Sequence, residues 1–263
     1  MSQPSTAVRM MVVDGVAEVV FDRPQALNTI DVATAEGFLA VCEALQARTD
    51  VRVIVLSGAG RAFMAGGDLA AFHAAADAQT LASAIIEPLN RALLLLAHMP
   101  QLVLGSVHGA VSGAGMSIAL GCDMTLAASD ARFCLAYTAI ATSLDGGGSW
   151  HLLRQVGRQR ALELALLNSV LSAEQVLQLG LICRVVAPDE LREQTWALAR
   201  KLAQGPSFAF AQVKHLLRQA ASKSLGEQLQ AEHEAFRACA GTADFREGIN
   251  AFFDKRKPQF VGT

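Results

Sequence analysis

Short β-rich runs alternate with segments of helical period over the first two-thirds of this chain, and that alternation limits the folds it can adopt. Residues 8–13 and 16–21 flank Asp14-Gly15, a two-residue turn signal that predicts an opening β-hairpin. Three later apolar runs end near Gly, Ser or Asp, with helix-like stretches between them: 51–56, 102–107 and 124–127. The alternation is typical of an α/β fold.

The helical segments divide the chain into two regions. Phe38, Val41, Cys42 and Leu45 repeat at the spacing of one helix face, as an ordinary packing surface does. From about Pro188 strand signals vanish, and helical patterns follow one another with breaks at 205–206, 222–224 and 241–242. We therefore expect a core over residues 1–187 and a helical region over residues 188–263.

Charge and composition restrict the partners. The 263 residues carry 22 Lys and Arg against 24 Asp and Glu, a net charge of −2 that creates no field to recruit nucleic acid or an acidic membrane surface. Hydrophobic residues make up 52% against 17% charged, and oligomerisation is a common way to bury such apolar surface. Small molecules and further copies of the chain are the expected partners.

Neither a membrane span nor a metal site is expected. The longest apolar run, residues 92–97, is far shorter than the roughly 20 residues that a spanning helix needs. The N-terminus, Met1 to Pro4, lacks the charged-then-apolar order of a secretory signal, so a cytoplasmic location is expected. Five scattered cysteines and six histidines show neither disulfide nor metal-ligand spacing.

Two glycine-rich segments follow strands and precede helices. They are Gly-Arg-Ala-Phe-Met-Ala-Gly-Gly-Asp-Leu at 60–69 and His-Gly-Ala-Val-Ser-Gly-Ala-Gly-Met-Ser at 108–117. Small residues allow a substrate to approach the main chain, and unpaired N–H groups at such turns bind developing negative charge. Two facing turns would form an oxyanion hole, whereas each alone could merely be a turn. Neither fits a Walker or dinucleotide-binding pattern.

Four segments in this order resemble the crotonase (enoyl-CoA hydratase/isomerase) superfamily: 23–28, 62–69, 109–123 and 255–257. The resemblance implies a spiral core of ββα repeats and a C-terminal helical trimerisation region, with trimers or dimers of trimers as the assembly. It implies an acyl-CoA thioester as substrate. No separate cofactor is implied, because coenzyme A is part of that substrate.

Position by position, the resemblance makes Gly67 and Ala114 the two N–H donors of the oxyanion hole. The family more often has Gly where this chain has Ala114, although a backbone donor does not require glycine. The remaining matches imply that Ala26, Leu27, Ala65 and Leu69 line the adenine and pantetheine path. Arg23 and Lys255 match phosphate contacts, and the alternative for each is an ordinary solvated charge. Asp68 matches an acidic residue of the family, and the interpretation favoured by its position is that it caps the next helix.

The residues at the family's catalytic positions separate the reactions. Family hydratases use two glutamates, and here those positions hold Ser117 and Tyr137, which we expect to line the substrate pocket. A hydroxyl and a phenol are too weakly ionised near pH 7 to act as carboxylate bases. This departure argues against simple hydration.

Asp145 is the candidate acid/base. The segment 144–150, Leu-Asp-Gly-Gly-Gly-Ser-Trp, resembles isomerases of phenylacetate-pathway and related enoyl-CoA substrates, in which this aspartate shuttles a proton. Burial in an apolar pocket would raise its pKa toward a useful value. The alternative is a purely structural role, in which Asp145 only caps the following helix. Functional alternatives are hydration, a nucleophilic aspartate as in dehalogenases or thioesterases of the superfamily, and non-catalytic acyl-CoA binding.

Overall fold

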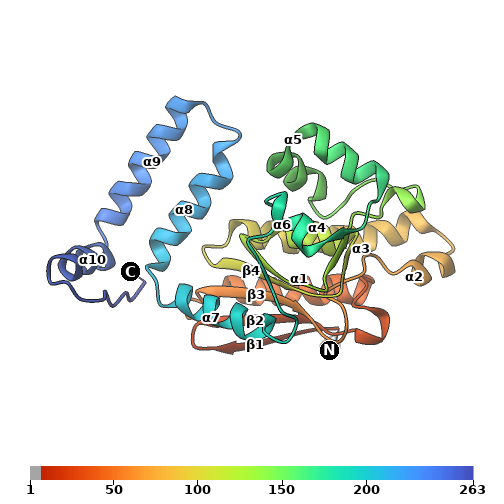
Figure 1. The fold of residues 1–263 in the computed structure, drawn as a ribbon, viewed down its shortest axis with the longest axis horizontal. Coiled ribbons are helices and arrows are strands. Elements are labelled where there is room, and N and C mark those ends of the chain that lie inside the picture. Colours follow the sequence, from red (N-terminus) through yellow and green to blue (C-terminus); the bar gives the residue numbers. More distant parts are fainter. Residues whose placement is uncertain (1–6, 263) are drawn as a thin grey trace.

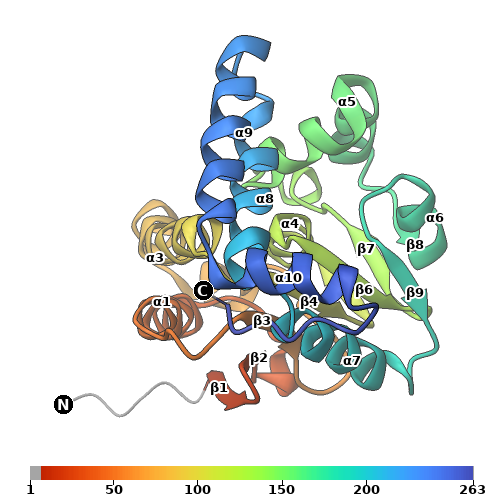
Figure 2. The ribbon, with the colours of Figure 1, turned by 90° about the vertical axis from the view of Figure 1, so that its left-hand side faces the viewer.

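The computed structural model describes residues 7–262, so the expectation drawn from Met1 to Pro4 lies outside the described residues. The chain forms an α/β core containing two sheets, and helices α8 and α9 project from it toward the C-terminus (Figures 1 and 2). The expected α/β class is confirmed.

The large sheet is six-stranded, in the order β1-β2-β3-β4-β6-β9. Strands β1 and β2 are antiparallel and every later pairing is parallel. The predicted hairpin is confirmed, because Asp14 and Gly15 both have positive φ, the mirror-image turn that matches the twist of paired strands. The strands are β1 (Val8–Val13), β2 (Val16–Phe21), β3 (Val53–Gly58), β4 (Leu102–Val107), β6 (Met124–Ala128) and β9 (Arg184–Val186).

Strand β3 begins two residues later than the apolar run at 51–56 indicates. The N–H groups of Arg52 and Val53 both donate to the Gly15 carbonyl, at 2.8 and 3.2 Å, so the chain is still turning there. Parallel pairing with β2 starts at Val53 opposite Val16 and continues to Gly58. The hairpin turn therefore sets where the strand starts.

A smaller sheet, in the order β5-β7-β8, lies beside the large one. Each repeat runs from a strand of the large sheet to a strand of the small sheet and then to a helix, as in β4-β5-α4 and β6-β7-α5. The expected ββα units are therefore present. The elements are β5 (Ala110–Ser112), β7 (Arg132–Cys134), β8 (Leu171–Ser172), α4 (Ala114–Gly121), α5 (Gly148–Leu167), α6 (Ala173–Gln178), and the short 3-10 turns η1 (Pro24–Ala26) and η2 (Thr138–Ile140).

The first repeat uses a single residue in place of a small-sheet strand. After β3, Met64 pairs with Val111 of β5 through an isolated parallel bridge, and the chain then enters α2 (Leu69–Ala74) and α3 (Ala78–His98). Successive repeats thus leave the sheets at neighbouring places. This arrangement brings the two glycine-rich segments together.

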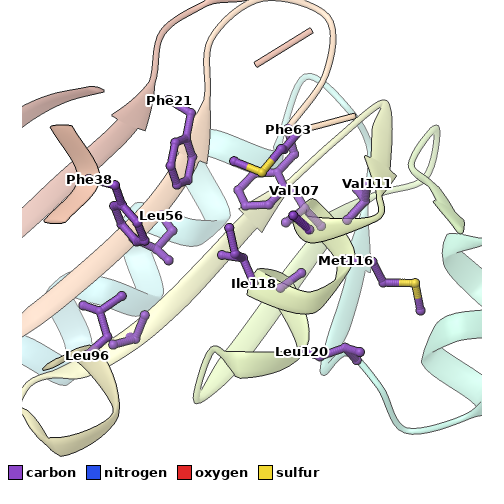
Figure 3. Packing of buried hydrophobic residues seen from close by; sticks show 14 of the residues in the cluster. Phe21, Phe38, Leu56, Phe63, Leu96, Val107, Val111, Met116, Ile118 and Leu120 are labelled. Atoms are coloured by element: carbon purple, nitrogen blue, oxygen red, sulfur yellow. The ribbon is translucent and has the colours of Figure 1, made fainter. Parts of the chain in front are cut away.

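Aromatic and aliphatic side chains fill the space between the large sheet and the helices (Figure 3). The Phe21 ring lies 5.0 Å from that of Phe38 on α1 (Val32–Gln46) and 6.0 Å from that of Phe63, between centroids. Met116 and Ile118 bring α4 into the same cluster, each about 1% exposed. The turn holding Phe63 and the helix after Gly113 therefore share one core.

The four predicted C-terminal helices and their breaks are confirmed as α7 (Leu191–Ala203), α8 (Ser207–Ala220), α9 (Leu225–Ala240) and α10 (Ala243–Phe253). Helix α7 packs Trp196 and Ala199 against the sheet face opposite the main core. Helix α8 is joined to the core by buried Lys214, whose Nζ lies 2.9 Å from the Asp123 carboxylate. The domain boundary expected at residue 187 stays a prediction.

By length and composition alone, α3 passes the test for a membrane-spanning helix, and it is the one helix of the described residues that does. The sequence expectation considered only the short run at 92–97 and missed this longer segment. In the fold, α3 packs on α1 and places Ile85 and Leu89 in the main core. The Glu43–Arg91 ion pair, at 2.9 Å, also joins the two helices. The apolar side of α3 is thus accounted for by packing in the core.

Candidate active site

The two glycine-rich turns contact each other directly. A Cβ placed on Gly113 would lie 3.4 Å from the Gly66 Cα, and one placed on Gly66 would lie 3.4 Å from the Ser112 carbonyl oxygen. Both glycines have positive φ, 108° at Gly66 and 52° at Gly113, which side chains rarely tolerate. Glycine is therefore needed here both for the contact and for the backbone shape.

The two N–H groups expected as oxyanion donors are unpaired. Gly67 forms a parallel bridge with Ile30, whose N–H bonds the Gly66 carbonyl and whose carbonyl accepts from the Asp68 N–H, so the Gly67 N–H is left out of the ladder. Ala114 is the first residue of α4, where a helix leaves its N–H without an internal partner. Among the described residues neither N–H has a protein acceptor.

Gly115 locks α4 against the first turn. A Cβ at this position would lie 2.5 Å from the Met64 carbonyl oxygen, a separation at which the main chain would have to move. The same carbonyl accepts a hydrogen bond from the Ser112 N–H at 2.9 Å. Close approach at Gly115 therefore fixes where the helix N-terminus sits relative to residue 67.

Asn28 organises the first turn from the side, a role that the sequence reasoning missed. Its buried amide nitrogen donates to the carbonyls of Ala59, Ala62 and Phe63 at 2.9, 2.8 and 3.2 Å, and its amide oxygen accepts from the Arg23 N–H at 2.8 Å. An asparagine that ends an early loop carries no such signal in sequence. Only the fold brings these carbonyls to it.

Arg23 and Asp68 are partners of each other. The Arg23 guanidinium lies 3.0 Å from the Asp68 carboxylate and 3.1 Å from that of Asp31, and it donates to the Thr29 carbonyl. Asp68 also caps α2 by accepting from the Ala71 N–H, so the capping alternative holds. Its pKa is lowered: burial opposes the shift, and the Ala71 and Arg23 bonds outweigh it. The phosphate contact for Arg23 stays a prediction, with two carboxylates already beside the cation.

Ser117, Tyr137 and Asp145 form a hydrogen-bonded chain. The Ser117 Oγ lies 2.8 Å from the Tyr137 hydroxyl, which donates to the Asp145 Oδ1 at 2.5 Å. Ser117 is fully buried, three residues after Ala114 and so on the same side of α4. Of the two residues expected to line the pocket, Tyr137 contacts the candidate acid/base directly and Ser117 is linked to it through Tyr137.

Asp145 does not cap helix α5. The N-cap is Gly147, with no side-chain capping bond, and Asp145 instead directs its carboxylate to Tyr137. Burial raises the pKa of Asp145, and the bond from Tyr137 partly opposes that shift. The expected direction of the shift and its cause are therefore confirmed, and the helix-cap alternative is wrong.

The loop after Asp145 packs closely on Ser117 and on His151. A Cβ on Gly148 would lie 2.4 Å from the Ser117 Oγ, and one on Gly147 would lie 3.2 Å from the His151 Cδ2. Burial, followed by Arg218 and Arg154, lowers the pKa of His151 to about 4, so it is neutral near pH 7. His151 is thus a packing residue behind the loop.

The remaining predicted contacts divide into two groups. Ala26 and Leu27 lie beside the first turn, where the Leu27 carbonyl accepts from the Ala65 N–H at 3.0 Å, and Leu69 is 52% exposed just after it. Lys255 follows α10, at the opposite end of the molecule from α2 (Figure 1). Within one chain, therefore, Lys255 is not part of the same site.

Known proteins match this chain along nearly its whole length. The enoyl-CoA hydratase/isomerase family matches residues 12–263. A Rhodobacter capsulatus protein named "Probable enoyl-CoA hydratase" is 39% identical, over 97% of this chain and 98% of its own. The 1,2-epoxyphenylacetyl-CoA isomerase of Escherichia coli is 38% identical, over 94% and 95% respectively. The crystal structure of a Bacillus anthracis enoyl-CoA hydratase superposes with a TM-score of 0.93 at 27% identity, covering 98% of this chain and 100% of that one.

These matches and the fold define an enzyme that acts on acyl-CoA thioesters. The chain belongs to the enoyl-CoA hydratase/isomerase family, as its motifs indicated. Its relatives include both hydratases and an isomerase, among them the 2,3-dehydroadipyl-CoA hydratase of Escherichia coli at 33% identity. Family membership therefore establishes the chemical class and leaves the individual reaction to the site.

Replacing Asn28 should disrupt the first turn. Asn28→Asp removes the donor to the carbonyls of Ala59, Ala62 and Phe63 and sets a carboxylate beside them, so we expect a loss of about 3 kcal/mol in unfolding free energy. Urea denaturation measures this loss. Gln25→Glu is the matched control, the same chemical change on an exposed side chain of the same loop, and should cost less than about 0.5 kcal/mol. Equal midpoints for both variants would refute the role of Asn28.

Proposed function

We propose that this protein is an enoyl-CoA double-bond isomerase, with Asp145 as the one acid/base and the Gly67 and Ala114 N–H groups as oxyanion donors. The observation that carries the proposal is the hydrogen-bonded chain at Asp145. It supplies one carboxylate with a raised pKa next to two hydroxyls that are already engaged. That set can move a proton, and it lacks a second carboxylate to activate water.

Proton transfer between two carbons follows from this geometry. The Asp145 carboxylate takes a proton from the α or conjugated γ carbon, and the electron pair of that C–H bond moves into the thioester carbonyl. The enolate oxygen so formed accepts from the two unpaired N–H groups, which act on charge that develops during the step. Asp145 then returns the proton to the other carbon, so that no atom is gained or lost.

The raised pKa of Asp145 suits both halves of this cycle. A carboxylate with an ordinary pKa is a weak base toward carbon, and burial makes the ionised form more basic. Because the ionised form starts the reaction, kcat/KM should fall at low pH, at a higher pH than an exposed aspartate would give. Tyr137 stays protonated, since burial, followed by the charge of Asp145, raises its pKa.

Hydration is the less favoured reaction at this site. Water addition would need a base that orients the water and an acid that protonates carbon, and Ser117 and Tyr137 occupy those two positions. Their hydroxyls bond each other and Asp145, so neither is unengaged. The hydratases among the relatives keep this reaction as the alternative.

One of the isomerases among the relatives supports a substrate class. The relative from Escherichia coli is named for an epoxide of phenylacetyl-CoA, and its similarity extends over 252 residues. We propose an acyl group derived from an aromatic ring, either opened or rearranged. The proposal needs no cofactor and no metal, because coenzyme A belongs to the substrate.

A homo-oligomer, trimer or hexamer, completes the proposal. Large apolar side chains are exposed on the C-terminal helices α8, α9 and α10, among them Leu217, Leu225, Phe236, Phe252 and Phe253, each at least 67% exposed. Burying such a surface against further copies would lower its free energy. A neighbouring subunit could also bring its Lys255 to a site that its own chain does not reach.

Replacing Asp145 tests the base. In deuterium oxide, the wild type should introduce deuterium at C2 or C4 of a suitable enoyl-CoA over many turnovers, whereas Asp145→Asn should be slower by about 100-fold or more. Mass spectrometry of the thioester measures the uptake. Asp130→Asn, the same change on an exposed side chain, is the matched control and should exchange like the wild type.

Other outcomes would select a different function. Uptake in Asp145→Asn as fast as in the wild type would show that the base is wrong. Loss of the ultraviolet absorbance of crotonyl-CoA would identify a hydratase. An acyl- or aryl-enzyme trapped on Asp145 in a single turnover would identify a nucleophile. Thermal stabilisation by acyl-CoA without any exchange would identify a non-catalytic binder.

Ala114→Pro tests the oxyanion hole with little change to the fold. Proline is well accepted at the first position of a helix, and it removes the N–H that has no protein partner. We expect kcat to fall by about 100-fold or more, the typical effect of losing one such donor. Ala114→Gly keeps the N–H and should retain most of the activity. Steady-state kinetics decide, and similar losses in both variants would refute the role of this N–H.

The mass of the protein in solution tests the assembly. Light scattering should give three or six chains of 27.8 kDa. Phe252→Glu combined with Phe253→Glu should shift that mass toward one chain, because carboxylates would replace two exposed rings and would have to be buried in the interface. A wild type that is monomeric at micromolar concentration would refute this part of the proposal.

A further inference from the structure

We propose that Tyr137, oriented by Ser117, is a positioning residue that confines the shuttled proton to one oxygen of Asp145, the one directed at the substrate. The inference rests on the isomerase function proposed above and goes beyond it. It assigns roles to two side chains that would otherwise be only pocket lining.

The direction of the hydrogen bonds follows from counting protons. An ionised carboxylate only accepts hydrogen bonds, so the Tyr137 hydroxyl donates its single proton to the Asp145 Oδ1. The 2.8 Å contact between the two hydroxyls must then use the Ser117 proton, with the Tyr137 oxygen as acceptor. The chain therefore runs one way, from Ser117 through Tyr137 to Asp145.

The carboxylate needs this support because the packing of the loop holds the main chain and not the Asp145 side chain. Gly146, Gly147 and Gly148 follow Asp145 directly, the first two at positive φ, and none of them has a side chain that could contact the carboxylate. The capping bond that could have fixed the side chain is not formed, since Gly147 is the N-cap. Tyr137 is therefore the described partner that holds the carboxylate in one orientation.

The tyrosine is well placed to supply that rigidity. Tyr137 is 7% exposed within the main core, and its carbonyl accepts from the N–H groups of Ile140 and Thr142. The next residue, Thr138, donates to the Ala165 carbonyl near the end of α5 and accepts from the Asn168 amide. A fixed phenol thus meets a carboxylate on a glycine-rich loop, and the phenol sets the geometry.

The bond from Tyr137 to Oδ1 restricts which oxygen of Asp145 can take the proton from carbon. Oδ1 accepts from Tyr137 before proton abstraction, and it can keep that bond afterwards as the carbonyl oxygen of the acid. The proton taken from carbon must then sit on Oδ2, for which the described residues provide no hydrogen-bond partner. The C–H bond breaks, the Oδ2–H bond forms, and the same proton is close to the second carbon. Direct return should therefore compete well with loss to solvent.

The main measurement is the fate of a deuterium label in a single turnover. An enoyl-CoA deuterated at the carbon that loses its proton is converted in ordinary water in a single turnover, and mass spectrometry gives the ratio of deuterium returned to the product over deuterium lost. In Tyr137→Phe this ratio should fall several-fold and kcat about ten-fold. The acidic limb of its kcat/KM profile should move to higher pH, because the ionised carboxylate loses a donor.

Two further variants make the test decisive. Ser117→Ala keeps the bond from Tyr137 to Asp145 but frees the phenol, so its ratio should lie between those of the wild type and Tyr137→Phe. Ser143→Ala removes an exposed hydroxyl from the same segment and should leave the ratio unchanged. Melting temperatures confirm that each variant is folded, and Ser117→Ala carries the test if Tyr137→Phe does not fold.

The two levels of proposal can fail separately. A wild-type ratio and an unmoved acidic limb in Tyr137→Phe, or in Ser117→Ala where that variant stands in, would overturn the positioning role while Asp145→Asn stays inactive. No isomerisation by the wild type with any enoyl-CoA, or full exchange in Asp145→Asn, would overturn the function itself.

Discussion

The contact between the two glycine-rich turns is the constraint on which the rest of the site depends. It exists because each ββα unit leaves the sheets beside the previous one, and because Gly66, Gly113 and Gly115 allow main chain to approach main chain. The approach leaves the N–H groups of Gly67 and Ala114 without partners among residues 7–262, in a region that is otherwise densely bonded. Unpaired donors cost stability unless something accepts from them, which is why we propose this pair as the oxyanion hole.

The environment of Asp145 shows opposing effects in balance. Burial raises the pKa of Asp145 and the Tyr137 hydroxyl opposes that shift, so the carboxylate is more basic than an exposed one while its ionised form keeps a hydrogen-bond donor. The same phenol orients this carboxylate, which forms no capping bond and is followed by glycines that have no side chain to contact it. A single hydrogen bond thus affects both the basicity and the orientation of the proposed base.

The C-terminal helices distinguish the parts of the proposed function that one chain supplies from the parts that an assembly would supply. Lys214 and Asp123 join α8 to the core, whereas α8, α9 and α10 expose large aromatic and aliphatic side chains along their length. The site from Gly67 to Asp145 lies in the core of one chain, and Lys255 lies beyond α10. In the proposed assembly, the residues that carry the chemistry come from one subunit, and a neighbouring subunit would contribute at the tail of the acyl-CoA.

The sequence alone determined the elements and the family. The hairpin, strand β4, the breaks of the helical region and both turns follow from local patterns of apolar residues, glycine and proline, which act over a few residues and so can be read in order. It also indicated Asp145, through the glycine-rich segment after it.

Tertiary structure decided the rest, because the remaining contacts join residues far apart in the chain. Asn28 meets three carbonyls more than thirty residues away, Arg23 pairs with Asp68, and Ser117 and Tyr137 reach Asp145 only once α4 and the loop before α5 are packed together. No local pattern records such distances, since they arise only when the whole sheet and its helices close around them.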